Sequence, residues 1–205
     1  GKVYYYTEAS FPEMKNPDHN KSRLDGLIIV VVKGIIVDAV IFEMKNKNEE
    51  IKKDKIDNYL QISKALKVSK FVTISNEFVS DFTHSPIKAK VPKGVSLYHF
   101  SWTYLMTKGQ LLLFKNDNNI ADEDQVEIMA ETLHYFENPI SGISGYTQMK
   151  DGWKILSQNI EAQKKLNKKK DEFIKEAVIS WYQEEKDIAL MMSRKLGVLV
   201  KPSNR

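Results

Sequence analysis

Two acidic residues and a lysine stand at the ends of two neighbouring apolar runs, and these side chains are the ones in this sequence best suited to chemistry. Asp25 opens the run that ends at Val32, and Glu43 and Lys45 close the run that begins at Ile35. Two carboxylates held together repel unless a cation lies between them, and Mg²⁺ accepts one or two carboxylates with water and phosphate oxygens. The alternative is that both acids face solvent at strand ends, with Lys45 as an ordinary surface partner.

The two apolar runs predict a β-hairpin. Both are rich in β-branched residues, and Lys33-Gly34 between them is typical of a tight turn. Antiparallel pairing around this turn brings Asp25 and Glu43 to the same end of the hairpin. Because side chains alternate between the faces of a strand, Glu43 and Lys45 point to the same side. We therefore expect two acids and an ammonium group to meet at the end of an apolar sheet.

A helix and a further strand are expected after the hairpin. Apolar residues recur there at helical spacing, as in Ile56, Tyr59 and Leu60. Residues 70–75 then have the character of a buried strand. A helix of that length between two strands predicts a crossover, so this strand should lie parallel to residues 37–45.

The spacing of the acids and the lysine resembles the PD-(D/E)XK signature of restriction-endonuclease-like nucleases. Asp25 is followed eighteen residues later by Glu43-Met44-Lys45, and Leu24 stands where the signature has proline. The resemblance covers residues 23–75, and the family core requires the same order of strand, hairpin, helix and strand. It implies an α/β protein with a restriction-endonuclease-like core, in which helices flank a mixed central sheet.

The resemblance also implies an activity, the metal-dependent hydrolysis of phosphodiester bonds in nucleic acid, with DNA as the expected substrate. Asp25, Glu43 and the backbone carbonyl of Met44 would hold Mg²⁺ or Mn²⁺. Such an ion lowers the pKa of bound water and neutralises charge that develops on the phosphate. Lys45 would orient the attacking water or stabilise that charge. Paired cuts in a duplex usually need two copies of such a site, so a homodimer is an open alternative to a monomer.

Members of the family often add an acid from the first helix or strand as a further metal ligand. Glu8, at the expected end of a first strand over residues 2–11, is the candidate here, with His19 as a second; the alternative for each is a surface loop residue. Some members also carry Gln-x-x-x-Tyr on the helix near the phosphate. Here Lys55, rather than Gln, precedes Tyr59 by four residues. The alternative for Tyr59 is a plain core residue. The candidates for contact with nucleic acid are Arg23, Lys47, Lys55, Tyr59, Gln61, Lys88, Lys90 and Lys93.

The composition limits the remaining possibilities. The chain has 205 residues, 42% of them hydrophobic, which is enough for one sizeable core. Cysteine is absent, which excludes disulfides and thiolate metal sites and favours the cytoplasm. No apolar run is long enough to predict a membrane span, and none has the character of a signal peptide. The net charge of +4 suits a polyanionic partner such as nucleic acid.

The C-terminal part predicts a helical extension. Residues 138–145, NPISGISG, are the best candidate for a boundary, which divides a nuclease-like core over 1–140 from a helical extension over 141–205. A heptad-like apolar seam over 171–195 should pack on the core or on a second subunit. Two other functions stay open: a catalytically silent nuclease fold that binds nucleic acid or serves in assembly, and an interaction protein that depends on helices within 150–200.

Overall fold

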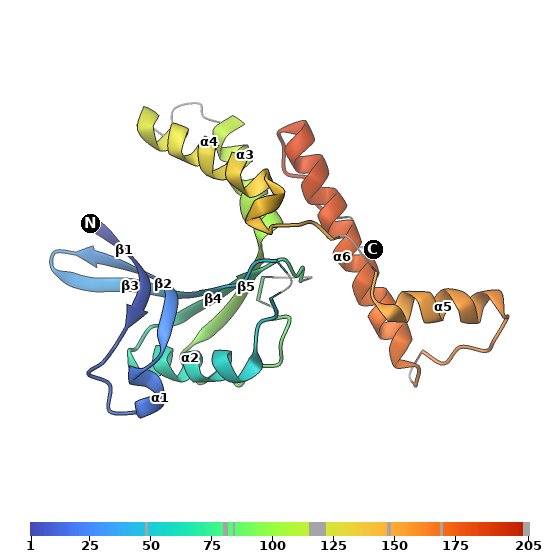
Figure 1. The fold of residues 1–205 in the computed structure, drawn as a ribbon, viewed down its shortest axis with the longest axis horizontal. Helices are drawn as coiled ribbons and strands as arrows, with labels where there is room; N and C mark the ends of the chain where they lie inside the picture. Colours follow the sequence, from blue (N-terminus) through green and yellow to red (C-terminus); the bar gives the residue numbers. More distant parts are fainter. Residues whose placement is uncertain are drawn as a thin grey trace. The chain divides into compact units, whose positions relative to one another are not determined.

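The computed structural model contains two compact units, Gly1–Ser101 and Trp102–Arg205, and each is described by itself. Together they form an α/β protein with a five-stranded mixed sheet, several helices and a long C-terminal helix (Figure 1). The residues that the structure describes are 1–47, 49–79, 82–83, 85–114, 122–146, 149–168 and 170–202.

The sheet of the first unit has the strand order β1-β2-β3-β4-β5 (Figure 1). Its antiparallel half consists of β1 (Lys2–Ser10), β2 (Arg23–Val32) and β3 (Ile35–Met44). Lys33 and Gly34 make the turn between β2 and β3, with φ angles of 51° and 78°. Positive φ at both turn residues matches the twist of the flanking strands in a two-residue hairpin. The predicted hairpin is confirmed.

The other half of the sheet is parallel. β4 (Lys70–Ser75) lies parallel to β3, and β5 (Ser96–Ser101) lies parallel to β4. Helix α2 (Lys53–Ala65) connects β3 to β4, so the predicted crossover and the predicted strand direction are both confirmed. A short helix, α1 (Pro17–Asn20), lies in the connection between β1 and β2.

Helix α2 lies against one face of the sheet and closes the hydrophobic core of the first unit (Figure 1). Ile56 and Leu60 from the helix are fully buried together with Ile41 and Phe71 from the strands. Each large apolar side chain buried in this way contributes about 1.5–3 kcal/mol. Tyr59, with 4% of its surface exposed, belongs to the same core, as its place on the apolar stripe of the helix predicted.

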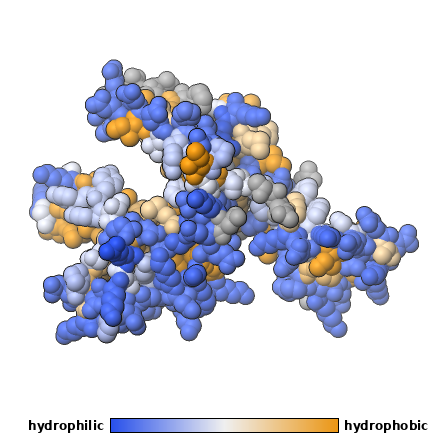
Figure 2. All heavy atoms as spheres, viewed as in Figure 1, coloured by the Kyte–Doolittle hydropathy of each residue, from blue (hydrophilic) through white to orange (hydrophobic). Residues whose placement is uncertain are grey.

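Strand β1 forms one edge of the sheet and exposes a row of tyrosines. Tyr4, Tyr5 and Tyr6 are 41, 73 and 48% exposed. By contrast, the part of the first unit that carries α1 and α2 presents mostly hydrophilic residues (Figure 2).

The second unit is helical in its described residues. Its elements are α3 (Trp102–Phe114), α4 (Glu123–Glu137), the short 3₁₀ helix η1 (Pro139–Ser141), α5 (Asp151–Glu161) and α6 (Glu172–Leu196). Helix α6 packs against α5 and α3. The helical extension predicted over 141–205 therefore contains helices α5 and α6.

The buried face of α6 is made mostly of small residues such as Ala177 and Ser180. It also contains Asp187, whose carboxylate oxygen Oδ2 accepts a hydrogen bond from the backbone N–H of Tyr146 at 2.8 Å. The predicted heptad-like seam contains Val178, Trp181 and Ile188, which are 46, 48 and 45% exposed and therefore lie outside this buried face.

The compact units divide after Ser101, so the predicted boundary near residue 140 falls inside the second unit. The predicted division separates a nuclease-like core over 1–140 from a helical extension over 141–205. It describes functional parts of the chain as well as compact units, and it stays a prediction. Within the described residues, no helix has both the length and the apolar character that a membrane span needs.

Candidate functional site

The hairpin brings Asp25 and Glu43 to adjacent positions at one end of the sheet. The register pairs Gly26 with Phe42, so Asp25 and Glu43 are the next residues on the two strands and share one face. Oδ2 of Asp25 accepts a hydrogen bond from the backbone N–H of Met44 at 2.7 Å. This bond holds the Asp25 carboxylate at the end of the strand pair.

Lys45 joins the two acids. Its Nζ lies 2.9 Å from Oε1 of Glu43 and 4.0 Å from Oδ2 of Asp25, and it donates to the carbonyl oxygen of Met44 at 3.2 Å. The backbone N–H of Lys45 donates to the carbonyl of Ile74 at 2.8 Å, which anchors the residue to β4. The three side chains that the sequence predicted to meet are therefore together, and their catalytic role stays a prediction.

A second ammonium group reaches Glu43 from helix α2. Nζ of Lys55 lies 2.7 Å from Oε1 of Glu43, the oxygen that Lys45 also contacts. The same Nζ lies 5.1 Å from the centroid of the Tyr59 ring, in a cation–π contact. The Tyr59 hydroxyl donates to the backbone carbonyl of Arg23, which ties α2 to the start of β2.

Glu43 is the most deeply buried charged group of the cluster. Its side chain is 1% exposed, compared with 19% for Lys45 and 36% for Lys55. Burial raises the pKa of Glu43 although both lysines act in the opposite direction, and the nearby charge of Asp25 raises it further. Burial also disfavours the charged form of Lys55, but its hydrogen bond and attraction to Glu43 outweigh this effect and raise the pKa of the ammonium group.

One oxygen of Glu43 has no hydrogen-bond partner among the residues that the structure describes. Oε2 is buried and accepts no hydrogen bond, whereas Oε1 takes both lysines. A buried carboxylate oxygen without a partner costs free energy, and a bound cation would offset that cost.

The donor set around this oxygen fits a hard divalent cation. Asp25, Glu43 and the Met44 carbonyl offer only oxygen atoms, which Mg²⁺ and Mn²⁺ prefer. The site has two carboxylates, and the described part of the chain contains no larger cluster of three or more His, Cys, Asp or Glu side chains able to hold an ion. Two carboxylates with water as the remaining ligands are a usual arrangement for Mg²⁺.

Glu8, the further candidate ligand, has a different partner. Its carboxylate lies 3.5 Å from the guanidinium of Arg23, and the two side chains are 64 and 72% exposed. Glu8 also has a positive φ of 52°, which interrupts the regular pairing of β1 with β2. The side-chain amide of Asn16 lies 3.3 Å from the ring of His19, the second candidate. Neither residue joins the two acids in an ion-binding group of the described chain.

The other candidates for contact with nucleic acid are spread over the first unit. Lys47 is exposed just beyond β3, and its carbonyl accepts a hydrogen bond from Asn76 at 2.9 Å. Gln61 is exposed on α2, six residues after Lys55 and therefore on a different side of the helix. Three exposed lysines lie in the connection between β4 and β5: Lys88, Lys90 and Lys93.

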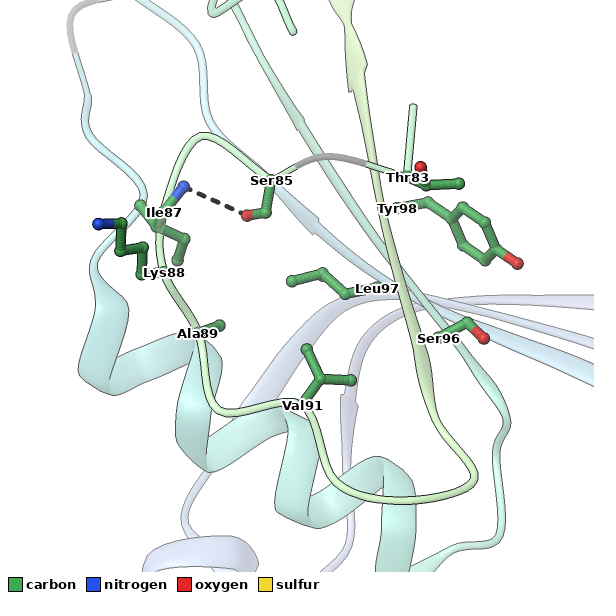
Figure 3. Close-up of a pocket in the computed structure, with 9 residues that line it drawn as sticks. All are labelled: Thr83, Ser85, Ile87, Lys88, Ala89, Val91, Ser96, Leu97 and Tyr98. Atoms are coloured by element: carbon green, nitrogen blue, oxygen red, sulfur yellow. Dashed lines mark hydrogen bonds between the residues drawn. The ribbon is translucent and has the colours of Figure 1, made fainter. Parts of the chain in front are cut away.

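A hollow of about 520 Å³ lies under the β4–β5 connection (Figure 3). Ile87, Val91 and Leu97 point into it, whereas Lys88 points away from it (Figure 3). The hydroxyl of Ser85 accepts a hydrogen bond from the backbone N–H of Ile87 at 3.3 Å. The described lining is mostly apolar and contains no acid, so we assign no chemistry to this hollow.

A second hollow, of about 400 Å³, lies between α1 and the start of α2. Asn58 on α2 donates to the hydroxyl of Ser22 at 2.9 Å and so ties the two segments together. Lys55 lines this hollow and also contacts Glu43, so it connects the hollow to the acidic cluster. The described lining is Pro17, Asp18, Lys21, Ser22, Asp54, Lys55 and Asn58.

The sequence-based reasoning missed two contacts of the cluster. It proposed Lys55 for a phosphate and not for Glu43, and it did not name Glu49, whose carboxylate lies 3.9 Å from Nζ of Lys45. The four-residue spacing of Lys55 and Tyr59 was a usable signal, because it puts both side chains on one side of a helix. Which strand residue they meet depends on how α2 packs, and local spacing does not contain that information.

Comparison of the chain with family models, with curated proteins and with solved structures gave no match in any of the three.

Proposed function

We propose that this chain is a metal-dependent nuclease with a restriction-endonuclease-like core, acting on nucleic acid with DNA as the favoured substrate. The observation that carries the proposal is the cluster of Asp25, Glu43 and Lys45, in which Oε2 of the buried Glu43 has no hydrogen-bond partner in the described part of the chain. The order of elements supports it as well, because an antiparallel hairpin leads through a helix to a parallel strand.

In this proposal Asp25, Glu43 and the Met44 carbonyl hold Mg²⁺ or Mn²⁺. When bound, such an ion lowers the pKa of a water ligand and neutralises charge on the scissile phosphate. The backbone N–H of Met44 keeps the Asp25 carboxylate oriented through its hydrogen bond to Oδ2. Lys45 donates a hydrogen bond to the attacking water or to a phosphate oxygen.

The test is a cleavage assay with Mg²⁺ or Mn²⁺ on supercoiled, linear and single-stranded DNA and on RNA. We expect Glu43→Gln and Lys45→Ala to lower the rate by at least about a hundredfold, because outer-shell partners of a metal alone contribute 10- to 100-fold. The matched control is Asp38→Asn on the same strand, since Asp38 pairs with Lys70 at 2.6 Å and takes no part in the cluster.

Circular dichroism must show that the variants keep the fold. Wild-type cleavage rates in a folded, contaminant-free preparation of Glu43→Gln would overturn the proposal. Cutting of both strands of a duplex would further predict a homodimer, which sedimentation measures directly.

A second candidate is a silent nuclease fold that binds nucleic acid without cutting it. The observation in its favour is that Lys45 and Lys55 already neutralise Glu43 without any ion. Calorimetric titration with Mn²⁺ separates the two candidates. A silent binder would show salt-sensitive affinity for DNA and no heat of metal binding that depends on Glu43.

A further inference from the structure

We propose that Lys55 is an internal counter-ion of the candidate site. It holds Oε1 of Glu43 while no divalent cation is bound, and it turns into the hollow between α1 and α2 to meet a substrate phosphate once a cation binds. This inference rests on the proposed function. It links binding of the divalent cation to binding of the substrate phosphate through the position of Lys55.

The first support is the crowding of charge at one oxygen. Lys45 and Lys55 both contact Oε1 of Glu43, at 2.9 and 2.7 Å. A divalent cation held by Glu43 and Asp25 would be repelled by both ammonium groups, and repulsion at such distances is strong where water is largely excluded. One of the two lysines is therefore expected to leave.

Lys55 is better able to leave than Lys45. Nζ of Lys45 also contacts the Met44 carbonyl and lies within 4.0 Å of Asp25 and Glu49, and its side chain is only 19% exposed. Lys55 is 36% exposed and reaches Glu43 from a helix through a long flexible side chain.

The hollow between α1 and α2 provides a place for the released ammonium group. Lys55 lines it together with Lys21 and Asn58, which are hydrogen-bond donors suited to a phosphate. Asp18 and Asp54 also line it, so the hollow attracts an anion only when Lys55 turns towards it. Binding of the cation at Glu43 and of a phosphate in the hollow should therefore favour each other.

The first experiment is calorimetric titration of the full chain with Mn²⁺ at pH 8. We expect Lys55→Met to bind Mn²⁺ about tenfold more tightly than the wild type, within the range usual for coupled sites. The matched control is Lys53→Met, which removes the same charge from the same helix. In the wild type, Lys53 pairs with Asp57 and not with Glu43. Unchanged or weaker Mn²⁺ affinity in Lys55→Met would overturn the inference.

The second experiment measures binding of a fluorescent phosphorothioate DNA duplex, which resists cleavage, at several salt concentrations. Loss of one phosphate contact lowers the salt slope by about one. We expect Lys55→Met to lower it with Mn²⁺ present and to leave it unchanged without metal. An equal loss in both conditions would contradict the exchange of Lys55 between Glu43 and the phosphate.

Titration with Mn²⁺ distinguishes failure of the proposed function from failure of the role of Lys55. If Mn²⁺ binding does not depend on Glu43, both the proposed function and this inference are wrong. If Mn²⁺ binding needs Glu43 but Lys55→Met does not strengthen it, only the inference is wrong.

Discussion

At the scale of single residues, two buried carboxylates show how surroundings decide a role. Glu43 has two lysines at one oxygen and none at the other. Asp187 is 6% exposed and accepts a hydrogen bond from the backbone of Tyr146. Burial raises the pKa of Asp187, against the effects of that hydrogen bond and of Arg194. The two environments agree with our proposal that Glu43 is a cation ligand, whereas Asp187 serves as a structural acceptor.

The raised pKa of Asp187 predicts a pH-dependent stability. The folded protein binds this proton more tightly than the unfolded chain, so the stabilisation is complete below the usual pKa of 3.8 and is lost as pH rises through the raised value. Asp187→Asn keeps an oxygen for Tyr146 and cannot titrate. Urea unfolding between pH 3.5 and 7 should show the wild type losing stability relative to this variant as pH rises.

The exposed acid Glu161 supplies the control, because Glu161→Gln on α5 should leave that pH trend in place. A stability difference between wild type and Asp187→Asn that stays constant over the whole pH range would contradict the prediction.

The sequence alone predicted that Asp25, Glu43 and Lys45 lie close together, because hairpin pairing and strand alternation follow from local sequence. The contact of Lys55 with Glu43 joins a helix to a strand. It follows from the packing of α2, which no local spacing determines.

At the scale of elements, the β2–β3 turn contains a residue in an unfavourable conformation. Lys33 has a φ of 51°, a left-handed backbone that costs a residue with a Cβ atom about 1–2 kcal/mol. Gly34 has a φ of 78° and bears no such cost. Gly34 is therefore well suited to the second position of the turn, whereas Lys33 is poorly suited to the first position.

Lys33→Asn should stabilise the protein by about 0.5–1 kcal/mol, because asparagine tolerates the left-handed region. Thermal or urea unfolding measures the gain. Lys33→Gln is the control, since it removes the same charge without easing the backbone. An equal gain in both variants would assign the effect to charge rather than to the turn.

The order and direction of the elements were predictable because two β-branched apolar runs flank a Gly-containing turn and a segment with helical spacing follows them. The composition around Pro139, Gly142 and Gly145 predicts a boundary between a core and an extension, and that boundary stays a prediction. The compact units divide after Ser101, where no such composition signal stands. Compactness depends on contacts between distant segments, and a Pro- and Gly-containing stretch also serves inside a unit.

At the scale of the whole molecule, the candidate site lies entirely within the first unit. Asp25, Glu43, Lys45 and Lys55 all precede Ser101, and the hydrophobic core around α2 uses residues of that unit alone. The residues named for the site and for its supporting core thus all belong to the first unit.

We expect residues 1–101 alone to fold and to bind Mn²⁺ in a manner that depends on Glu43. Circular dichroism and calorimetry of this fragment, with its Glu43→Gln variant as control, measure both properties. A fragment that folds but binds no Mn²⁺, while the full chain does, would show that the second unit contributes to the site.

Strand β3 belongs to both halves of the mixed sheet, and this shared position bears on the order in which the site assembles during folding. A hairpin forms in microseconds, whereas parallel pairing must first close the longer loop through α2. Asp25 and Glu43 would then come together early, as neighbours in a nascent hairpin. Lys55 reaches Glu43 only when helix α2 docks on the sheet. Until then, the two carboxylates of the early hairpin are exposed to water and to cations in solution.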